Sequence, residues 1–236
     1  MVEAPKARLR QVGESSRPAP NPDSGVLIIG LGRFGSAIAL TLQSLDKDVL
    51  GVEKDPAIVR HFTGRFPLVE ADVTNPEALT QLSAGDFPVA VVGVGTSLEA
   101  SVLITGNLVD LGTPQIWAKA TSPEHARILE RIGAHHVVLP EADAGNRVAH
   151  LVSGKLLDYI EVEDGFTIVK MRPPRETQGF TVGEAQIRKR YGVTVIGVKS
   201  PGEEFVYATD ETRVSAHDIL IVSGHAHLLE RFAARP

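Results

Sequence analysis

The sequence predicts an α/β protein, with a Rossmann-like doubly wound parallel sheet followed by a small C-terminal α+β domain. Three observations carry this prediction. From Gly25 onward, short apolar runs alternate with segments of helical character, which is typical of a parallel sheet covered by helices on both faces. A glycine-rich turn separates the first run from the first helix. After about Leu157 the alternation stops, and shorter strand-like runs take over.

Each predicted strand of the first domain is a short apolar run. In chain order these runs are Val26–Ile29, Asp48–Val52, Leu68–Val69, Val89–Val94, Gln115–Ala118 and His136–Leu139. The segments between them carry the start signals of helices, which are Asp55-Pro56, Thr74-x-x-Glu77 and Ser122-Pro123-Glu124. Glycines stand where three of these helices should end, at Gly64, Gly112 and Gly133.

The rest of the chain is organised differently. Strands are predicted at residues 166–171, 193–198, 204–208 and 218–222, with helices near Val182–Arg190 and Ala226–Ala234. A connecting helix is predicted where apolar residues recur at helical spacing, at Val148, Leu151, Val152 and Leu156. We therefore expect a flexible, proline-rich tail over residues 1–24, a parallel-sheet domain over 25–142, a connecting helix over 143–158 and a C-terminal domain over 159–236.

Composition excludes several classes of protein. The 236 residues contain no cysteine, which excludes disulfides, thiolate catalysis and zinc–thiolate sites and fits a cytoplasmic location. No apolar run approaches the ~18–20 residues of a membrane helix, and we expect no secretory signal at the N-terminus. The formal net charge of −5 argues against nucleic acid as a partner.

The glycine-rich turn, Gly30-Leu-Gly32-Arg-Phe-Gly35, matches a dinucleotide-binding fingerprint in its required context between a strand and a helix. We expect Gly30 to permit a tight turn, Gly32 to let a diphosphate approach the backbone, and Gly35 to let the helix pack closely on the strand. A phosphate would then meet backbone N–H groups at the positive end of the helix dipole.

Glu53 ends the second predicted strand, where a carboxylate can accept hydrogen bonds from both ribose hydroxyls and repel a 2′-phosphate. This favours NAD, ATP or ADP over NADP. Asp55 could also reach the ribose, but its position before Pro56 favours a helix N-cap.

Several further polar residues and glycines follow the ends of the other parallel strands, the edge at which such sheets bind ligands. They are Asp72, Gly93, Gly95, Lys119 and Glu141. An aspartate that binds the base, a lysine that faces phosphate and a carboxylate that holds Mg²⁺ beside a triphosphate are chemically sensible here. Each of these residues, taken alone, could equally be an ordinary surface group.

Several segments resemble the regulator-of-potassium-conductance domain. In the first domain they are Gly30–Gly35, Glu70–Thr74, Ala118–Ala120, Ile132–Val137 and Pro140-Glu141. Near the end of the chain, Tyr191–Ile196 and Asp218–Val222 resemble the small C-terminal module of the same family. The similarity extends from about Gly25 to the end of the chain. It is greatest to the cytosolic subunit of Ktr-type potassium uptake systems, which carries one such unit, whereas Trk-type relatives usually carry two.

This resemblance implies a gating subunit without enzyme activity, assembled from dimers into an octameric ring beneath a separate potassium channel or transporter in the membrane. It implies ATP or ADP in the first domain, with NAD(H) in Trk-type relatives. Arg33 would approach the terminal phosphate, and Glu141 would help to hold a divalent cation. The matching nucleotide-contacting residues are Gly30, Gly32, Arg33, Phe34, Gly35, Glu53, Lys54, Asp72, Val73, Gly93, Gly95, Lys119 and Glu141.

Some members of this family bind cyclic di-AMP in the C-terminal module at a dimer seam. Ile187-Arg188 and Tyr191-Gly192 match that pattern, whereas Thr194 stands where those relatives often have asparagine. The match to a cyclic di-AMP site is therefore only partial.

Two other classes of function compete with this interpretation. A nicotinamide-dependent oxidoreductase needs a proton donor or acceptor beside the nicotinamide, and the eight histidines form no convincing cluster. Ser36, Ser97 and Ser101 lack the context of a nucleophile. A redox-sensing repressor needs a basic helix-turn-helix, and the segment before Gly25 is too short and proline-rich to form one.

Overall fold

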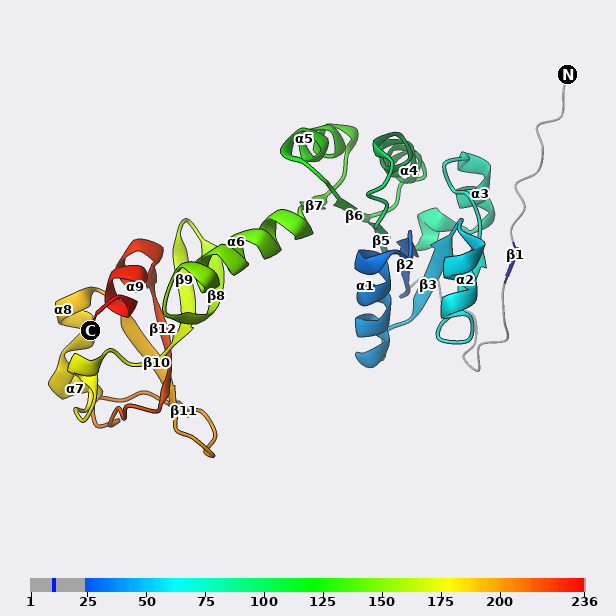
Figure 1. The fold of residues 1–236 in the computed structure, drawn as a ribbon. Helices are drawn as coiled ribbons and strands as arrows, with labels where there is room; N and C mark the ends of the chain where they lie inside the picture. Colours follow the sequence, from blue (N-terminus) through cyan, green and yellow to red (C-terminus); the bar gives the residue numbers. More distant parts are fainter. Residues whose placement is uncertain (1–9, 12–23, 236) are drawn as a thin grey trace, which may run out of the picture. The chain divides into compact units, whose positions relative to one another are not determined.

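The computed structural model of this chain describes residues 10–11 and 24–235. The chain divides into two compact units, with the boundary between Glu141 and Ala142 (Figure 1). The predicted flexible tail over residues 1–24 lies outside the described residues except for Arg10, Gln11 and Ser24. Arg10–Gln11 forms a two-residue strand, β1, which the sequence did not predict.

The first unit is built on a seven-stranded sheet in the order β1-β4-β3-β2-β5-β6-β7. Strands β2 to β7 are parallel and span Val26–Ile29, Val49–Glu53, Leu68–Glu70, Val89–Val92, Gln115–Lys119 and His136–Val138. Only β1 runs antiparallel to its neighbour, β4. The strand order reverses between β2 and β5, because the chain crosses from β4 back past the first parallel strand. The predicted doubly wound sheet is confirmed.

Helices cover both faces of this sheet, because alternate residues of its strands point to opposite sides. Ile28 packs with residues of α1 (Arg33–Ser44) and α2 (Pro56–Phe62). Its neighbours Leu27 and Ile29 pack in a separate core with α3 (Pro76–Gln81), α4 (Leu98–Asp110) and α5 (Pro123–Ile132). A short 3₁₀ helix, η1, covers Ala84–Asp86. The continuous apolar character of the strands follows from this burial on both faces.

Two of the predicted helix starts are confirmed and one is wrong. The Asp55 side chain accepts from the Ala57 N–H at 2.8 Å, and Ser122 accepts from the His125 N–H at 3.2 Å. The predicted capping box at Thr74 does not form. Asn75 caps α3 instead, while the Thr74 hydroxyl donates to Asp72. Asn75 is the N-cap because it directly precedes Pro76, which occupies the first helical position.

The connecting helix begins and ends earlier than predicted. Helix α6 covers Pro140–Ser153, and Leu156 belongs to the next strand, β8 (Leu156–Glu163), so residues 154–158 are not helical. Leu156 matches the helical spacing of Leu151 and Val152, but it is buried in the core of the second unit as a strand residue. Because Leu156 alone fits both the helical spacing and the alternation of a strand, spacing could not place the end of the helix.

The second unit contains a five-stranded antiparallel sheet in the order β11-β10-β12-β9-β8. Its other strands are β9 (Phe166–Met171), β10 (Thr194–Lys199), β11 (Val206–Tyr207) and β12 (Ile219–His225). A turn at Asp164-Gly165, with positive φ at both residues, joins β8 to β9. The helices are η2 (Arg175–Thr177), α7 (Val182–Ala185), α8 (Ile187–Tyr191) and α9 (Ala226–Ala233). The predicted α+β character of this unit is confirmed.

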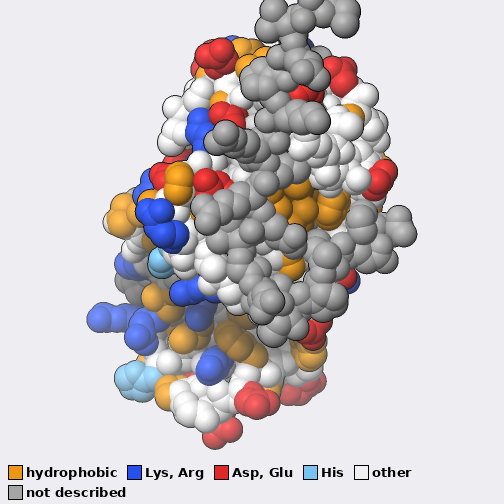
Figure 2. Space-filling view, turned by 90° about the vertical axis from the view of Figure 1, so that its right-hand side faces the viewer, with side chains coloured by type: hydrophobic (Ala, Val, Ile, Leu, Met, Phe, Trp, Pro, Cys, Tyr) orange, Lys and Arg blue, Asp and Glu red, His pale blue; other side chains and the backbone are white. Residues whose placement is uncertain are grey.

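Acidic and basic side chains both occur among the hydrophobic ones on the face of the molecule in Figure 2. Within residues 10–11 and 24–235, no helix has the length and apolar character needed to cross a membrane.

Candidate nucleotide-binding site

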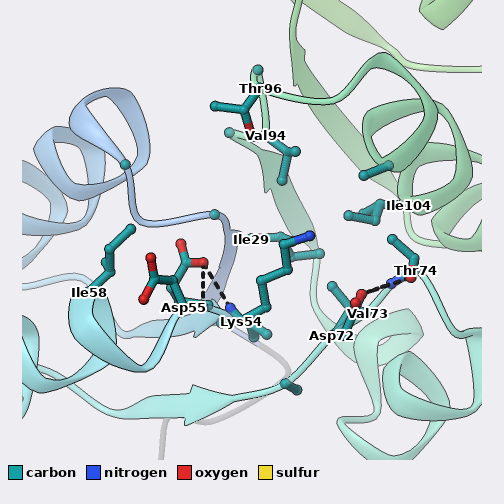
Figure 3. Close-up of a pocket in the computed structure, with 18 residues that line it drawn as sticks. Ile29, Lys54, Asp55, Ile58, Asp72, Val73, Thr74, Val94, Thr96 and Ile104 are labelled. Carbon is teal, nitrogen blue, oxygen red and sulfur yellow. Dashed lines mark hydrogen bonds between the residues drawn. The ribbon is translucent and has the colours of Figure 1, made fainter.

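A cavity of about 270 Å³ lies at the carboxyl ends of β2, β3, β4 and β5 (Figure 3). This is the point at which the strand order reverses, where doubly wound sheets bind their ligands. The lining includes many of the predicted site residues, which are Gly30, Gly32, Glu53, Lys54, Asp72, Val73, Gly93 and Gly95. Arg33, Phe34, Gly35, Lys119 and Glu141 do not line this cavity.

The three glycines of the loop have the geometry that their expected roles require. Gly30 has a φ of +86°, which only glycine adopts readily. A Cβ on Gly35 would approach the Gly30 carbonyl oxygen far more closely than Cβ atoms do in proteins, so helix and strand meet only because no side chain stands there. A Cβ on Gly32 would meet no atom within 4 Å. Gly32 therefore leaves open space at the start of α1, where it supplies no side-chain cap.

Glu53 holds the glycine loop in place. Its carboxylate is buried and accepts from three backbone N–H groups, at 2.7 Å from Leu31, 2.8 Å from Lys54 and 3.0 Å from Asp55. A carboxylate offers about four acceptor positions, so one remains for a ligand hydroxyl. The sequence predicted contact with ribose. The structure adds a second role, because Glu53 also links β3 to the loop after β2.

Lys54, Asp55 and Asp72 contribute charge around the cavity (Figure 3). The Lys54 side chain extends across the cavity in this view, whereas Asp55 caps α2. Asp72 accepts from the Thr74 hydroxyl at 2.7 Å and from the Thr74 N–H at 3.1 Å. The hydrogen bond from the Thr74 hydroxyl lowers the pKa of Asp72, assisted by the Thr74 N–H and the Lys54 ammonium. Asp72 is therefore a carboxylate at neutral pH.

The apolar walls of the cavity were not predicted from the sequence. Ile58 of α2, Val94 of the loop after β5 and Ile104 of α4 line it, together with Thr96 (Figure 3). Such walls suit the flat faces of a purine base. The nearest sequence signal is the position of Ile58, which directly follows the capped start of α2. The other two residues look like ordinary core residues.

A second, charged group lies beside the glycine loop. The Lys119 ammonium, at the end of β6, is 2.7 Å from a Glu141 carboxylate oxygen and 5.8 Å from the centre of the Phe34 ring. The hydrogen bond from Lys119 lowers the pKa of Glu141, and the Arg33 guanidinium adds to that effect. A Cβ on Gly95 would lie 3.4 Å from the Lys119 ammonium. Gly95 therefore borders both the cavity and this charged group.

Glu141 was predicted to be a ligand of a divalent cation. Its carboxylate pairs with Lys119, and no group of three or more His, Asp or Glu side chains able to hold a metal occurs in the described ranges 10–11 and 24–235. Mg²⁺ beside a nucleotide usually keeps several waters and binds one or two carboxylates together with the phosphates, so the role of Glu141 as a cation ligand stays a prediction.

Histidine and tyrosine are absent from the described residues that line the cavity. His125 is buried, and its ring accepts from the Thr121 N–H. His135 accepts from the Ile116 N–H, and His136 stacks on Trp117. These histidines have structural contacts and offer no proton donor or acceptor at the cavity.

A doubly wound sheet with a glycine loop, an acid at the end of the neighbouring strand and a cavity at the reversal of strand order defines a nucleotide-binding protein of the Rossmann-like class. Residues 26–140 match the model of the TrkA-N domain, and residues 178–235 match that of the TrkA-C domain. The chain is 31% identical over 207 residues to the Ktr system potassium uptake protein A of Bacillus subtilis (strain 168). That match covers 87% of this chain and 93% of the relative.

Two solved structures share the fold. The GsuK RCK domain has a TM-score of 0.64 at 21% identity, over 93% of this chain and 50% of that one. The GsuK channel bound to NAD has a TM-score of 0.64 at 20% identity, over 91% of this chain and 40% of that one. This chain thus spans half or less of the length of these structures. It belongs to the TrkA-N/TrkA-C family.

Proposed function

We propose that this chain is the cytosolic regulatory subunit of a potassium uptake system and that it switches its membrane partner by binding ATP or ADP, with NAD(H) as a further candidate ligand. The observation that carries the proposal is the position of Glu53. Its buried carboxylate joins the glycine loop to β3 at the cavity and keeps an acceptor position for a ribose hydroxyl. The potassium uptake relatives and the NAD-bound channel of the same fold support the proposal.

The charged group beside the loop supplies a way to distinguish nucleotides. Lys119 pairs with Glu141, which stands in the first turn of α6, the helix that leads into the second unit. A terminal phosphate that approaches Arg33 and Lys119 competes with Glu141 for their positive charge. ATP carries one more phosphate than ADP, so the two nucleotides should compete with the Lys119–Glu141 ion pair to different extents. Only such a difference in affinity shifts a conformational equilibrium.

We further propose that the chain assembles from dimers into an octameric ring below a separate membrane subunit, which would keep it at the inner face of the cell membrane. Large apolar side chains stand exposed on α6, with Val148 at 53% and Val152 at 78% exposure. Their burial against a second copy would stabilise assembly. Light scattering measures the oligomeric state directly. A measured mass of 25.3 kDa, that of a single chain, at micromolar concentration would contradict the proposal.

Replacing Arg33 with alanine should keep ADP affinity nearly intact and remove most of the preference for ATP. A guanidinium forms two parallel hydrogen bonds to a phosphate, and a charge-assisted bond contributes about 1.5–3 kcal/mol, which is roughly ten- to a hundredfold in affinity. Titration calorimetry with ATP and ADP measures both affinities. Arg127→Ala is the matched control, because Arg127 is exposed on α5 and pairs only with Glu124 among the described residues. A variant that distinguishes ATP from ADP as well as wild type would exclude Arg33 as the sensor.

The alternative function, a nicotinamide-dependent oxidoreductase, requires a proton donor or acceptor beside the nicotinamide. Lys54 is the cavity residue able to fill that role, because the described lining contains no histidine or tyrosine. A regulatory subunit binds nucleotides without consuming them. NADH that is oxidised in the presence of the purified chain and candidate carbonyl substrates would favour the oxidoreductase.

A further inference from the structure

A second cavity, of about 120 Å³, lies in the C-terminal unit between α8 and α9. Leu228 and Phe232 form its apolar side, and Tyr191 ends α8 beside them. The remaining lining residues are all arginines, which are Arg190, Arg231 and Arg235. The side chains of Arg190 and Arg235 are 48% and 45% exposed, so water solvates these guanidinium groups, and an anion that enters the cavity would meet several N–H donors at once.

Two of the three arginines are held in place by their neighbours. The guanidinium carbons of Arg190 and Arg235 lie 5.0 Å and 5.1 Å from the centre of the Tyr191 ring. Glu176 lies near both, at 3.8 Å from an Arg190 nitrogen and 3.7 Å from an Arg235 nitrogen. These distances exceed those of a hydrogen bond, so Glu176 orients the two groups without engaging their N–H donors closely.

The third guanidinium and the tyrosine hydroxyl complete the set of donors. Arg231 forms no ion pair with the residues that the structure describes. The Tyr191 hydroxyl is buried beside the Glu176 carboxylate, and no hydrogen bond of good geometry satisfies it among the described residues. Burial and the nearby Glu176 carboxylate raise the pKa of Tyr191, so its hydroxyl remains a donor at neutral pH. The single Glu176 carboxylate therefore does not balance the charge of the three guanidinium groups.

We propose that this cavity binds a phosphoryl group, either as free phosphate or as part of a larger phosphorylated ligand. Planar guanidinium forks match the oxygens of phosphate, and three of them balance a dianion even with Glu176 nearby. A cavity needs roughly 10–15 Å³ for each water molecule, so about 120 Å³ holds a group several waters in size. The apolar side formed by Leu228 and Phe232 leaves room for an organic portion of the ligand.

This cavity shares Tyr191 with the partial match to a cyclic di-AMP site but differs from it in its other residues. Ile187 of that match is 1% exposed and belongs to the core, so it offers no ligand surface. Arg188 and Arg190 stand two residues apart on α8 and do not face each other. Only Arg190 lines the cavity, whereas Arg188 is exposed on the other flank.

The test is hydrogen exchange of the full-length chain with and without inorganic phosphate, read on peptides that cover α8 and α9. Because the readout is local, phosphate bound at the glycine loop does not disturb it. Phosphate should slow exchange in both helices. Arg231→Gln should weaken binding and so raise the half-saturating phosphate concentration roughly tenfold or more. Arg188→Gln is the matched control on α8 and should leave the half-saturating phosphate concentration within about twofold of wild type. Arg231 lacks an ion pair in the described residues, so its replacement should spare the fold, which thermal unfolding checks.

Pyrophosphate and cyclic di-AMP, titrated in parallel, distinguish the sources of the phosphoryl group. Protection by phosphate alone identifies a small anion, and stronger protection by a larger ligand that Arg231→Gln also abolishes identifies a phosphorylated organic molecule. Both results support the site. Loss of protection with Arg188→Gln and not with Arg231→Gln would overturn the proposal, and so would exchange that none of the three compounds changes.

Discussion

Replacing Gly35 with alanine should lower the thermal unfolding midpoint of the chain and abolish nucleotide binding. The new methyl group would meet the carbonyl oxygen of Gly30 far inside the 3.0 Å that Cβ atoms keep from other atoms. The obstacle is backbone, so no side-chain rotation relieves it. Overpacking of this kind costs about 1–3 kcal/mol or more, and here it displaces the loop that would hold the phosphates. Calorimetric melting and ADP titration measure the two effects.

Gly32→Ala is the matched control for this loop. Gly32 has a φ of −63°, and a Cβ there meets nothing within 4 Å, so alanine should leave the melting midpoint unchanged. It should still weaken ADP binding, because the added methyl group occupies the open space at the start of α1. Equal melting midpoints for Gly35→Ala and wild type would contradict the close packing of helix and strand. Unchanged ADP affinity in Gly32→Ala would place the diphosphate elsewhere.

Glu53→Gln should reduce ADP and NAD affinity by roughly ten- to a hundredfold, since hydrogen bonds to a charged group contribute about 1.5–3 kcal/mol. An amide presents one acceptor oxygen in place of two, so it cannot serve Leu31, Lys54 and Asp55 as the carboxylate does. The loop loses its link to β3 and the ribose loses its acceptor. The variant should also reject NADP less strongly, because the negative charge that repels a 2′-phosphate is gone.

Asp55→Asn is the matched control for Glu53→Gln, because it also replaces a carboxylate with an amide at this edge of the sheet. Asparagine caps a helix as well as aspartate does, so α2 should keep its start. We expect ADP affinity within about threefold of wild type for this variant. Titration calorimetry of both variants with ADP, NAD and NADP makes the comparison. If Glu53→Gln binds all three as wild type does, Glu53 has no place in the site.

Features that depend on local spacing could be predicted from the sequence. Asp55 and Ser122 cap their helices because each precedes a proline, and this signal lies within two residues. Gly30 and Gly35 could be assigned because a turn and a close approach require glycine.

Features that depend on distant contacts could not be predicted. The loop-bracing role of Glu53 requires the Leu31 N–H, 22 residues away in the chain, to lie beside its carboxylate. Ile104 lines the cavity, yet its sequence context matches that of core residues on the same helix. Two local signals competed at Thr74 and Asn75, and the proline that follows Asn75, the same signal as at Asp55 and Ser122, identified the cap.

The central claim is that nucleotide bound at Glu53 and the glycine loop switches potassium transport. Potassium flux into vesicles that carry the membrane subunit, with and without this chain, tests it most directly. We expect the flux to depend on this chain and to differ between ATP and ADP, with Glu53→Gln removing that difference and Asp55→Asn preserving it. Flux that is the same with ATP, with ADP and without nucleotide, while the chain is bound to its partner, would contradict the account.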